Sequence, residues 1–72
     1  MGIEIRLILA DILRQRNMSR YELAKRSDVP YPTIDRYYRN KVVRYDSDII
    51  RRICLALDCT PGDLIRLVET EE

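Results

Sequence analysis

The sequence predicts a compact all-α domain of five short helices, with a short β-ribbon between its two termini as an additional element. Most apolar residues recur at the spacing of an amphipathic helix. Capping residues and prolines separate these stretches from one another. At 72 residues, the chain has room for one domain that buries only ~60% of its unfolded surface, too little to enclose a deep substrate cavity. We therefore expect residues 1–72 to form a single domain without an internal linker.

The N-terminal residues carry two overlapping patterns. A first helix is expected over residues 7–16, because its inward positions keep helical spacing and Met18 can close it against the next helix. The inward positions are Leu9, Ile12 and Leu13. Apolar and polar residues also alternate over residues 3–7, so an extended segment and a first helical turn both stay open.

The C-terminal residues show the same alternation. Ile65 and Leu67 are separated by one polar residue shortly before the acidic tail, which covers residues 69–72. We predict that residues 3–7 pair with residues 64–68 as a two-stranded ribbon, within one chain or between two. Such a ribbon is marginal alone and needs the helices to support it.

The next helix begins with a capping box. Ser19 can accept a hydrogen bond from the amide of Glu22, and the Glu22 carboxylate can reach back to the amide of Ser19. Leu23 and Ala24 are the inward positions of this helix. Two cations, Lys25 and Arg26, suit its negative end, and Ser27 and Asp28 interrupt the pattern.

A third helix is expected from about residue 31 to about residue 39 or 40. Pro30 and Pro32 are tolerated only before a helix or in its first turn, where a missing amide has no partner to lose. One face of the helix is apolar: Ile34, Tyr37 and Tyr38. The other face is free to contact a partner: Pro32, Thr33, Arg36, Arg39 and Asn40. The spacing with Ile34 favours packing over base stacking for Tyr37, and half-burial is expected for Tyr38.

Two helices complete the chain after a connection over residues 42–45. The fourth begins at Asp46 or Ser47 as cap, and its apolar face is formed by Ile49, Ile50, Ile53, Cys54 and Leu57. Thr60, Pro61 and Asp63 supply a cap, a first-turn proline and an acid at the third position, which predict a short last helix. Leu64 and Leu67 are expected to return to the core.

The charge distribution has a strongly basic segment despite a net charge of +1. Residues 14–44 contain nine cations and three acidic residues, a net charge of +6, whereas residues 45–72 carry −4 and residues 1–13 carry −1. A basic segment of this kind attracts phosphates, and the acidic tail, which phosphates repel, is expected to stay away from them. The alternative is a solvated charge cluster of the kind common on helical proteins.

Several classes of protein are disfavoured. No apolar run approaches the ~20 residues of a membrane span, and the N-terminus lacks the pattern of a cleaved leader, so we expect a cytoplasmic protein. The chain has two cysteines, no histidine and no C-x-x-C spacing, which argues against a metal site. Cys54 and Cys59 are expected to be buried, reduced thiols. An enzyme is disfavoured because no catalytic constellation or phosphate-binding loop is present.

One set of residues forms a pattern over almost the whole chain: Ser19, Glu22, Leu23, Ala24, Val29, Thr33, Ile34, Lys41, Ile50, Ile53, Leu57, Pro61 and Leu64. With the helices in this order, the chain resembles the lambda-repressor-like, Cro-type helix-turn-helix family of transcriptional regulators. The resemblance implies sequence-specific binding of double-stranded DNA, with a recognition helix at about residues 31–39 in the major groove. It also implies a homodimer, because two copies on half-sites multiply affinity and specificity. No cofactor, metal, membrane or small-molecule ligand is implied.

The resemblance also assigns roles to individual residues. The residues expected to face the bases are Tyr31, Pro32, Thr33 and Arg36. The residues expected to contact phosphates are Arg20, Arg39, Lys41 and Arg44. Arg36 is the best candidate for bidentate recognition of guanine, against the alternative of a merely exposed arginine. Arg39 can instead form a local i, i+4 pair with Asp35.

Three departures from the family pattern qualify these expectations. Arg20 stands where members commonly have glutamine, which favours a phosphate contact over a base contact. Asp28 and Asn40 stand where glycine is common, and both residue types tolerate a left-handed backbone. The rigid, donor-poor step from Pro30 to Pro32 motivates an alternative function, a protein-interaction module or antitoxin-like subunit that keeps the fold without specific DNA binding.

Overall fold

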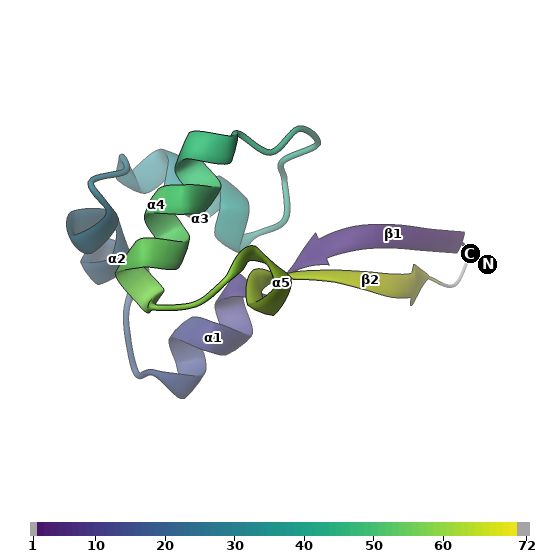
Figure 1. Cartoon of the computed structure of the whole chain (residues 1–72), viewed down its shortest axis with the longest axis horizontal. Coiled ribbons are helices and arrows are strands. Elements are labelled where there is room, and N and C mark those ends of the chain that lie inside the picture. Colours follow the sequence, from purple (N-terminus) through teal and green to yellow (C-terminus); the bar gives the residue numbers. More distant parts are fainter. Residues whose placement is uncertain (1, 71–72) are drawn as a thin grey trace.

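A computed structural model describes residues 2–70 and shows a body of five helices from which a two-stranded ribbon projects (Figure 1). The elements follow the order β1 (Gly2–Leu7), α1 (Leu9–Gln15), α2 (Arg20–Ser27), α3 (Tyr31–Tyr38), α4 (Ser47–Leu57), α5 (Pro61–Leu64) and β2 (Ile65–Thr70). The five predicted helices are therefore present, but the fold is not purely all-α, because the ribbon is a regular antiparallel pair. None of the helices described is long and apolar enough to cross a membrane.

The ribbon joins the two ends of one chain. Its register runs from Gly2 opposite Thr70 to Leu7 opposite Ile65, so the predicted pairing of residues 3–7 with 64–68 is shifted by one residue at β2. Leu64 is not part of the strand, because it is the last residue of α5 and is fully buried. Glu69 lies in β2, whereas residues 71–72 of the predicted acidic tail lie outside the described residues.

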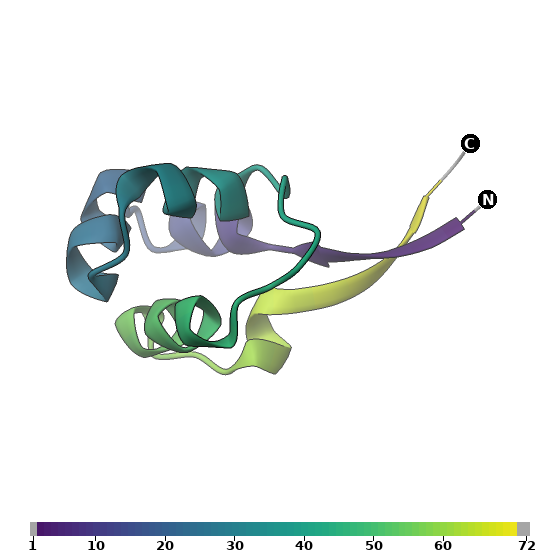
Figure 2. The same ribbon diagram turned by 90° about the horizontal axis from the view of Figure 1, so that it is seen from above.

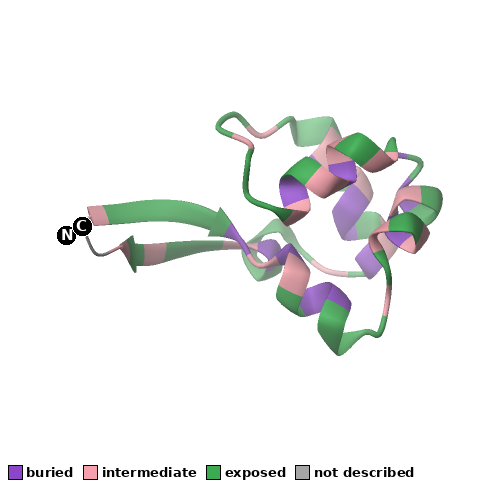
Figure 3. Cartoon of the chain, turned by 180° about the vertical axis from the view of Figure 1, so that it is seen from behind, coloured by how far each residue is buried: buried purple, intermediate pink, exposed green. Residues whose placement is uncertain are grey.

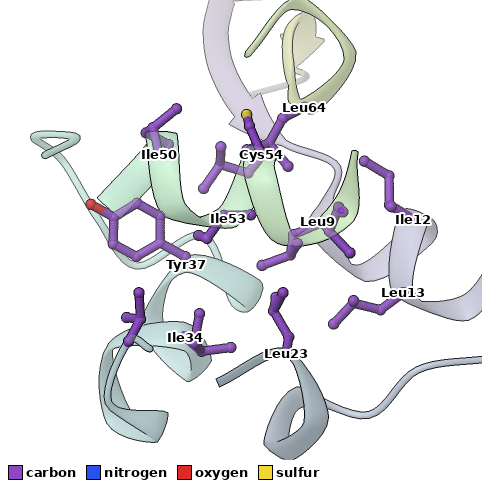
Figure 4. Close-up of a cluster of buried hydrophobic side chains, with 13 residues drawn as sticks. Leu9, Ile12, Leu13, Leu23, Ile34, Tyr37, Ile50, Ile53, Cys54 and Leu64 are labelled. Carbon is purple, nitrogen blue, oxygen red and sulfur yellow. The ribbon is translucent and has the colours of Figure 1, made fainter. Parts of the chain in front are cut away.

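The helices form two groups around one core. Figure 2 shows α2 and α3 on one side of the body and α4 with α5 on the other. Side chains from both groups and from α1 meet between them, as the close-up in Figure 4 shows for Leu9, Leu23, Ile34 and Ile53, all of which are fully buried. The expectation that Leu67 returns to the core is wrong: this side chain is 72% exposed, because it belongs to the projecting ribbon.

Two features at the helix ends refine the sequence analysis. Ser19 accepts a hydrogen bond from the Glu22 amide at 3.0 Å, but the Glu22 carboxylate accepts a bond from Arg26 at 2.6 Å. Of the two hydrogen bonds of the predicted capping box, the one from the Glu22 amide to Ser19 is formed. The Glu22 carboxylate does not bond the Ser19 amide, because Arg26 provides a charged partner one helical turn away. Asp28 and Asn40 adopt left-handed backbone angles, φ 59° and 58°, as their residue types predicted.

α1 begins at Leu9, two residues later than predicted, because Leu7 belongs to β1. The backbone N–H of Leu7 donates to the side-chain oxygen of Asn40 at 2.7 Å, and its carbonyl accepts a hydrogen bond from the Asn40 amide group at 2.9 Å. These bonds hold Leu7 extended, so the helix cannot include it.

The two cysteines differ in environment. Cys54 is buried in the core, as expected, whereas Cys59 is only partly buried. Burial, followed by the neighbouring Cys59 and the charge of Asp63, raises the pKa of the Cys54 thiol to about 11. The thiolate is the nucleophilic form, so Cys54 is chemically unreactive at neutral pH.

We therefore expect alkylation by iodoacetamide at pH 8 to modify Cys59 first. A thiol whose pKa is raised from 9.0 to about 11 has roughly 100-fold less thiolate at this pH, and burial restricts access further. Mass spectrometry of peptides from briefly treated protein measures the two rates. Both cysteines should react alike in denaturant, and equal rates in the native protein would contradict this assignment.

Candidate nucleic-acid interface

α2 and α3 form a helix-turn-helix unit whose inner faces are fixed by the core. The turn between them contains Asp28 in the left-handed conformation and Val29, which is buried. Leu23 of α2 and Ile34 of α3 are both fully buried. Since residues on one side of α3 are held in the core, the residues on its other side face solvent.

The end of α3 is secured by Tyr37. Its ring is 2% exposed, which confirms that it packs, and its hydroxyl accepts a hydrogen bond from the backbone N–H of Asp46 at 3.0 Å. Asp46 in turn caps α4 by accepting bonds from the amides of Asp48 and Ile49. One tyrosine thus connects α3 to the start of α4 and fixes the loop between them.

The residues predicted to face bases lie together on the first two turns of α3. Pro32 and Arg36 are exposed, and Tyr31 and Thr33 are partly exposed. Within residues 2–70, the guanidinium of Arg36 has no ion-pair partner. Its charge is therefore available to a ligand, which is the property that a base-contacting arginine requires.

The four cations predicted to contact phosphates fall into two groups. Lys41 and Arg44 are exposed in the loop after α3, and neither forms an ion pair within the described part of the chain. Arg20 and Arg39 both bind the Asp35 carboxylate, at 2.5 Å and 3.0 Å. The local pair of Arg39 with Asp35, the alternative that the sequence left open, is therefore formed.

The comparisons with known proteins agree with this geometry. Residues 9–70 match the model of the Cro/C1-type HTH DNA-binding domain. The chain belongs to this family. A crystal structure of the transcriptional regulator VanUg, Form II, shares the fold with a TM-score of 0.73 and 24% sequence identity, over 97% of this chain and 92% of that chain. No curated protein sequence matches the chain significantly.

In this Cro/C1-type domain, Arg20 also has a positioning role that the sequence did not reveal. Its guanidinium carbon lies 4.5 Å from the centroid of the Tyr38 ring, a cation–π distance, while one of its nitrogens binds Asp35. Arg20 belongs to α2 and both of its partners belong to α3. These contacts hold the first turn of α2 against the outer part of α3.

Asp35 is the acidic centre of this cluster. Desolvation is the largest single effect on it and raises its pKa, but the hydrogen bonds and charges of Arg39 and then of Arg20 together lower the pKa below the ordinary 3.8. Because the pKa of Asp35 is lower in the folded than in the unfolded protein, its ion pairs stabilise the fold fully above pH 3.8. This stabilisation is lost as the pH falls through the lowered pKa. Asp35 is therefore ionised at neutral pH.

Tyr21 is a further member of this surface that the sequence did not reveal. Its ring stacks on that of Tyr31, with centroids 4.3 Å apart and planes 14° apart, and the side chain is 67% exposed. The pair extends the exposed surface of α3 onto the start of α2. The sequence shows only an aromatic residue next to Arg20. Whether its ring reaches Tyr31 depends on how α2 crosses α3.

Proposed function

We propose that this Cro/C1-type domain is a transcriptional regulator that binds double-stranded DNA sequence-specifically, with α3 in the major groove and two copies on adjacent half-sites. The observation that carries the proposal is the division of α3 into a buried side and an exposed side on which Arg36 has no ion-pair partner among residues 2–70. An α-helix with its side chains is about 10–12 Å in diameter, so α3, with its eight residues, fits a major groove about 12 Å wide.

The proposed base contacts come from the start of α3. Arg36 can donate two hydrogen bonds to the O6 and N7 acceptors of guanine. Thr33 offers a methyl group to thymine and a hydroxyl group to either a base or a phosphate. Tyr31 and Pro32 present apolar surface suited to thymine methyl groups, and Tyr21 extends this surface through its stacked ring.

The proposed phosphate contacts flank this surface. Lys41 and Arg44 are exposed at one end of α3, where they suit a phosphate on the far strand. Arg20 and Arg39 keep free N–H donors although each binds Asp35, because a guanidinium carries five. Asp35 therefore orients these two arginines without using up their capacity for a phosphate oxygen.

Selection of bound fragments from random DNA, followed by fluorescence anisotropy titrations, tests the proposal. We expect one enriched motif and an affinity that falls steeply with salt. Four phosphate contacts per copy correspond to a slope of log affinity against log salt of about −3.6 for one copy and about −7 for two. No enriched motif together with salt-independent absence of binding would overturn the proposal and favour the protein-interaction module.

Arg36→Ala should reduce the affinity for the enriched site by roughly 5- to 150-fold, the equivalent of about 1–3 kcal/mol, and affect random DNA much less. Lys41→Ala is the matched control, because a phosphate contact carries no sequence information and its loss should weaken both kinds of DNA alike. The same titrations measure both variants. An unchanged site preference in Arg36→Ala would show that this arginine does not read a base.

A further inference from the structure

One face of the projecting ribbon is apolar and open to solvent. Directly opposite residues of an antiparallel pair share a face, so Ile5 and Leu67 lie side by side in the middle of the ribbon, with Ile3 next to them toward the tip, where the exposed Glu69 lies opposite Ile3 and ends the apolar surface. These three side chains, which we call the apolar ribbon face, are 66%, 56% and 72% exposed for Ile3, Ile5 and Leu67. Figure 3 shows that most of the ribbon is exposed.

The other face of the ribbon has a different composition. Arg6 lies opposite Arg66, and Glu4 lies opposite Val68, so charged side chains keep this face in water. Among the described residues, the other large exposed apolar side chains lie away from the ribbon and from one another: Tyr21, which stacks on Tyr31, Val43 in the loop after α3, and Leu55 on α4. Contiguous exposed apolar surface beside a polar surface is typical of an interaction site, whereas single exposed residues are not.

We propose that the apolar ribbon face binds the same face of a second copy of the chain. This proposal deepens the proposed function, on which it rests for the requirement that two domains occupy adjacent half-sites. A two-fold axis through the middle of the ribbon pairs identical surfaces. It places Ile5 and Leu67 of one copy against the same residues of the other.

The dimensions of the molecule favour this occupant. The longest extent is 38 Å, and Figure 1 shows the ribbon lying along this direction beyond the helical body. A strand of six residues is about 20 Å long, which leaves about 18 Å for the body. Two copies overlapped along their ribbons would place the centres of their bodies about 38 Å apart, close to the 34–36 Å between half-sites one DNA turn apart.

The position of the ribbon also leaves the DNA-binding surface free. The ribbon extends past the end of the body in both views (Figures 1 and 2), so a second copy bound to it does not cover α3. At its base, Leu7 is bound by Asn40, which follows α3. The ribbon is thus connected directly to the recognition helix, and the geometry of the dimer can determine the spacing of the two helices.

The interface is small. A two-stranded ribbon about 20 Å long and about 10 Å wide offers about 200 Å² per copy, against the ~800 Å² per partner of a standard interface. We therefore expect partial association that increases with protein concentration and becomes complete on DNA with two half-sites, where binding of the first copy raises the effective concentration of the second.

Sedimentation equilibrium of the full chain without DNA tests the interface over roughly 10 μM to 1 mM. The average mass of the wild type should rise toward twice the monomer mass, whereas Ile5→Lys and Leu67→Lys should stay monomeric. Leu55→Lys, which adds the same charge at an exposed leucine of α4, should associate like the wild type. Circular dichroism checks that all variants keep the fold.

Two results would overturn the proposal: a wild type that stays monomeric over the whole range, or association that survives in Leu67→Lys and Ile5→Lys. Titrations with DNA separate this failure from that of the proposed function. Leu67→Lys should bind one half-site like the wild type and lose the gain from a second. Specific half-site binding by a chain that never associates would overturn only the ribbon interface, and association without any DNA binding would overturn only the proposed function.

Discussion

Replacing Leu23 with alanine is expected to lower the free energy of unfolding by about 2–5 kcal/mol. Leu23 is fully buried in the core, where it lies near Leu9 and Ile34 (Figure 4). Truncation removes buried methyl groups and leaves a cavity that the neighbouring helices fill only in part. A domain of this size is stable by roughly 4–11 kcal/mol in total, so the variant should lose a large fraction of its stability.

Urea denaturation followed by circular dichroism measures this loss. Leu55→Ala is the matched control, because it makes the same substitution in a helix at a side chain that is 70% exposed. The control should change the free energy of unfolding by less than about 0.5 kcal/mol. Equal losses in the two variants would contradict the placement of α2 against the core and, with it, the orientation of α3.

Much of the helix-turn-helix unit follows from local sequence signals. Ser19 caps α2 and prolines mark the start of α3, so the predicted bounds differ from the observed ones by one or two residues. The spacing of Ile34 and Tyr37 identified the buried side of α3, because an eight-residue helix has only one stripe that can face a core. These signals act between residues close in sequence, where geometry is set by the backbone.

The remaining features depend on pairs that are distant in sequence. Arg20 and Asp35 are 15 residues apart, and the partner of Arg20 is decided by how α2 crosses α3. The stack of Tyr21 on Tyr31 has the same origin. Leu67 has the periodicity of a buried strand residue, but its exposure depends on the absence of any helix beneath the ribbon, which no local pattern expresses.

The Asn40 side chain holds the backbone of Leu7 through two hydrogen bonds, which we call the Asn40 clamp. This clamp gives the second prediction with a large expected effect. The sequence predicted only that asparagine tolerates a left-handed backbone there. The structure adds two hydrogen bonds from its side chain to the backbone of Leu7, 33 residues away. Asn40→Ala should lower the free energy of unfolding by about 2–4 kcal/mol, because it removes both bonds and puts alanine, which tolerates the left-handed conformation less well than asparagine, at a position with φ 58°.

Asn40→Gly separates these two contributions. Glycine adopts the left-handed conformation without strain, so only the hydrogen bonds are lost and the expected cost falls to about 1–2 kcal/mol. Urea denaturation should therefore rank the wild type above Asn40→Gly and Asn40→Gly above Asn40→Ala. Amide hydrogen exchange at Leu7 reports on the clamp directly and should accelerate in both variants.

The glycine variant decides whether the clamp has a structural effect. If Asn40→Gly is as stable as the wild type and the Leu7 amide exchanges at the same rate, the two bonds do not hold the ribbon to α3. If the amide exchange accelerates as expected, the connection between the ribbon and the end of α3 is weakened. If two copies pair through their ribbons as proposed, the variant should then tolerate a wider range of half-site spacings than the wild type, because the ribbon is held less rigidly to α3.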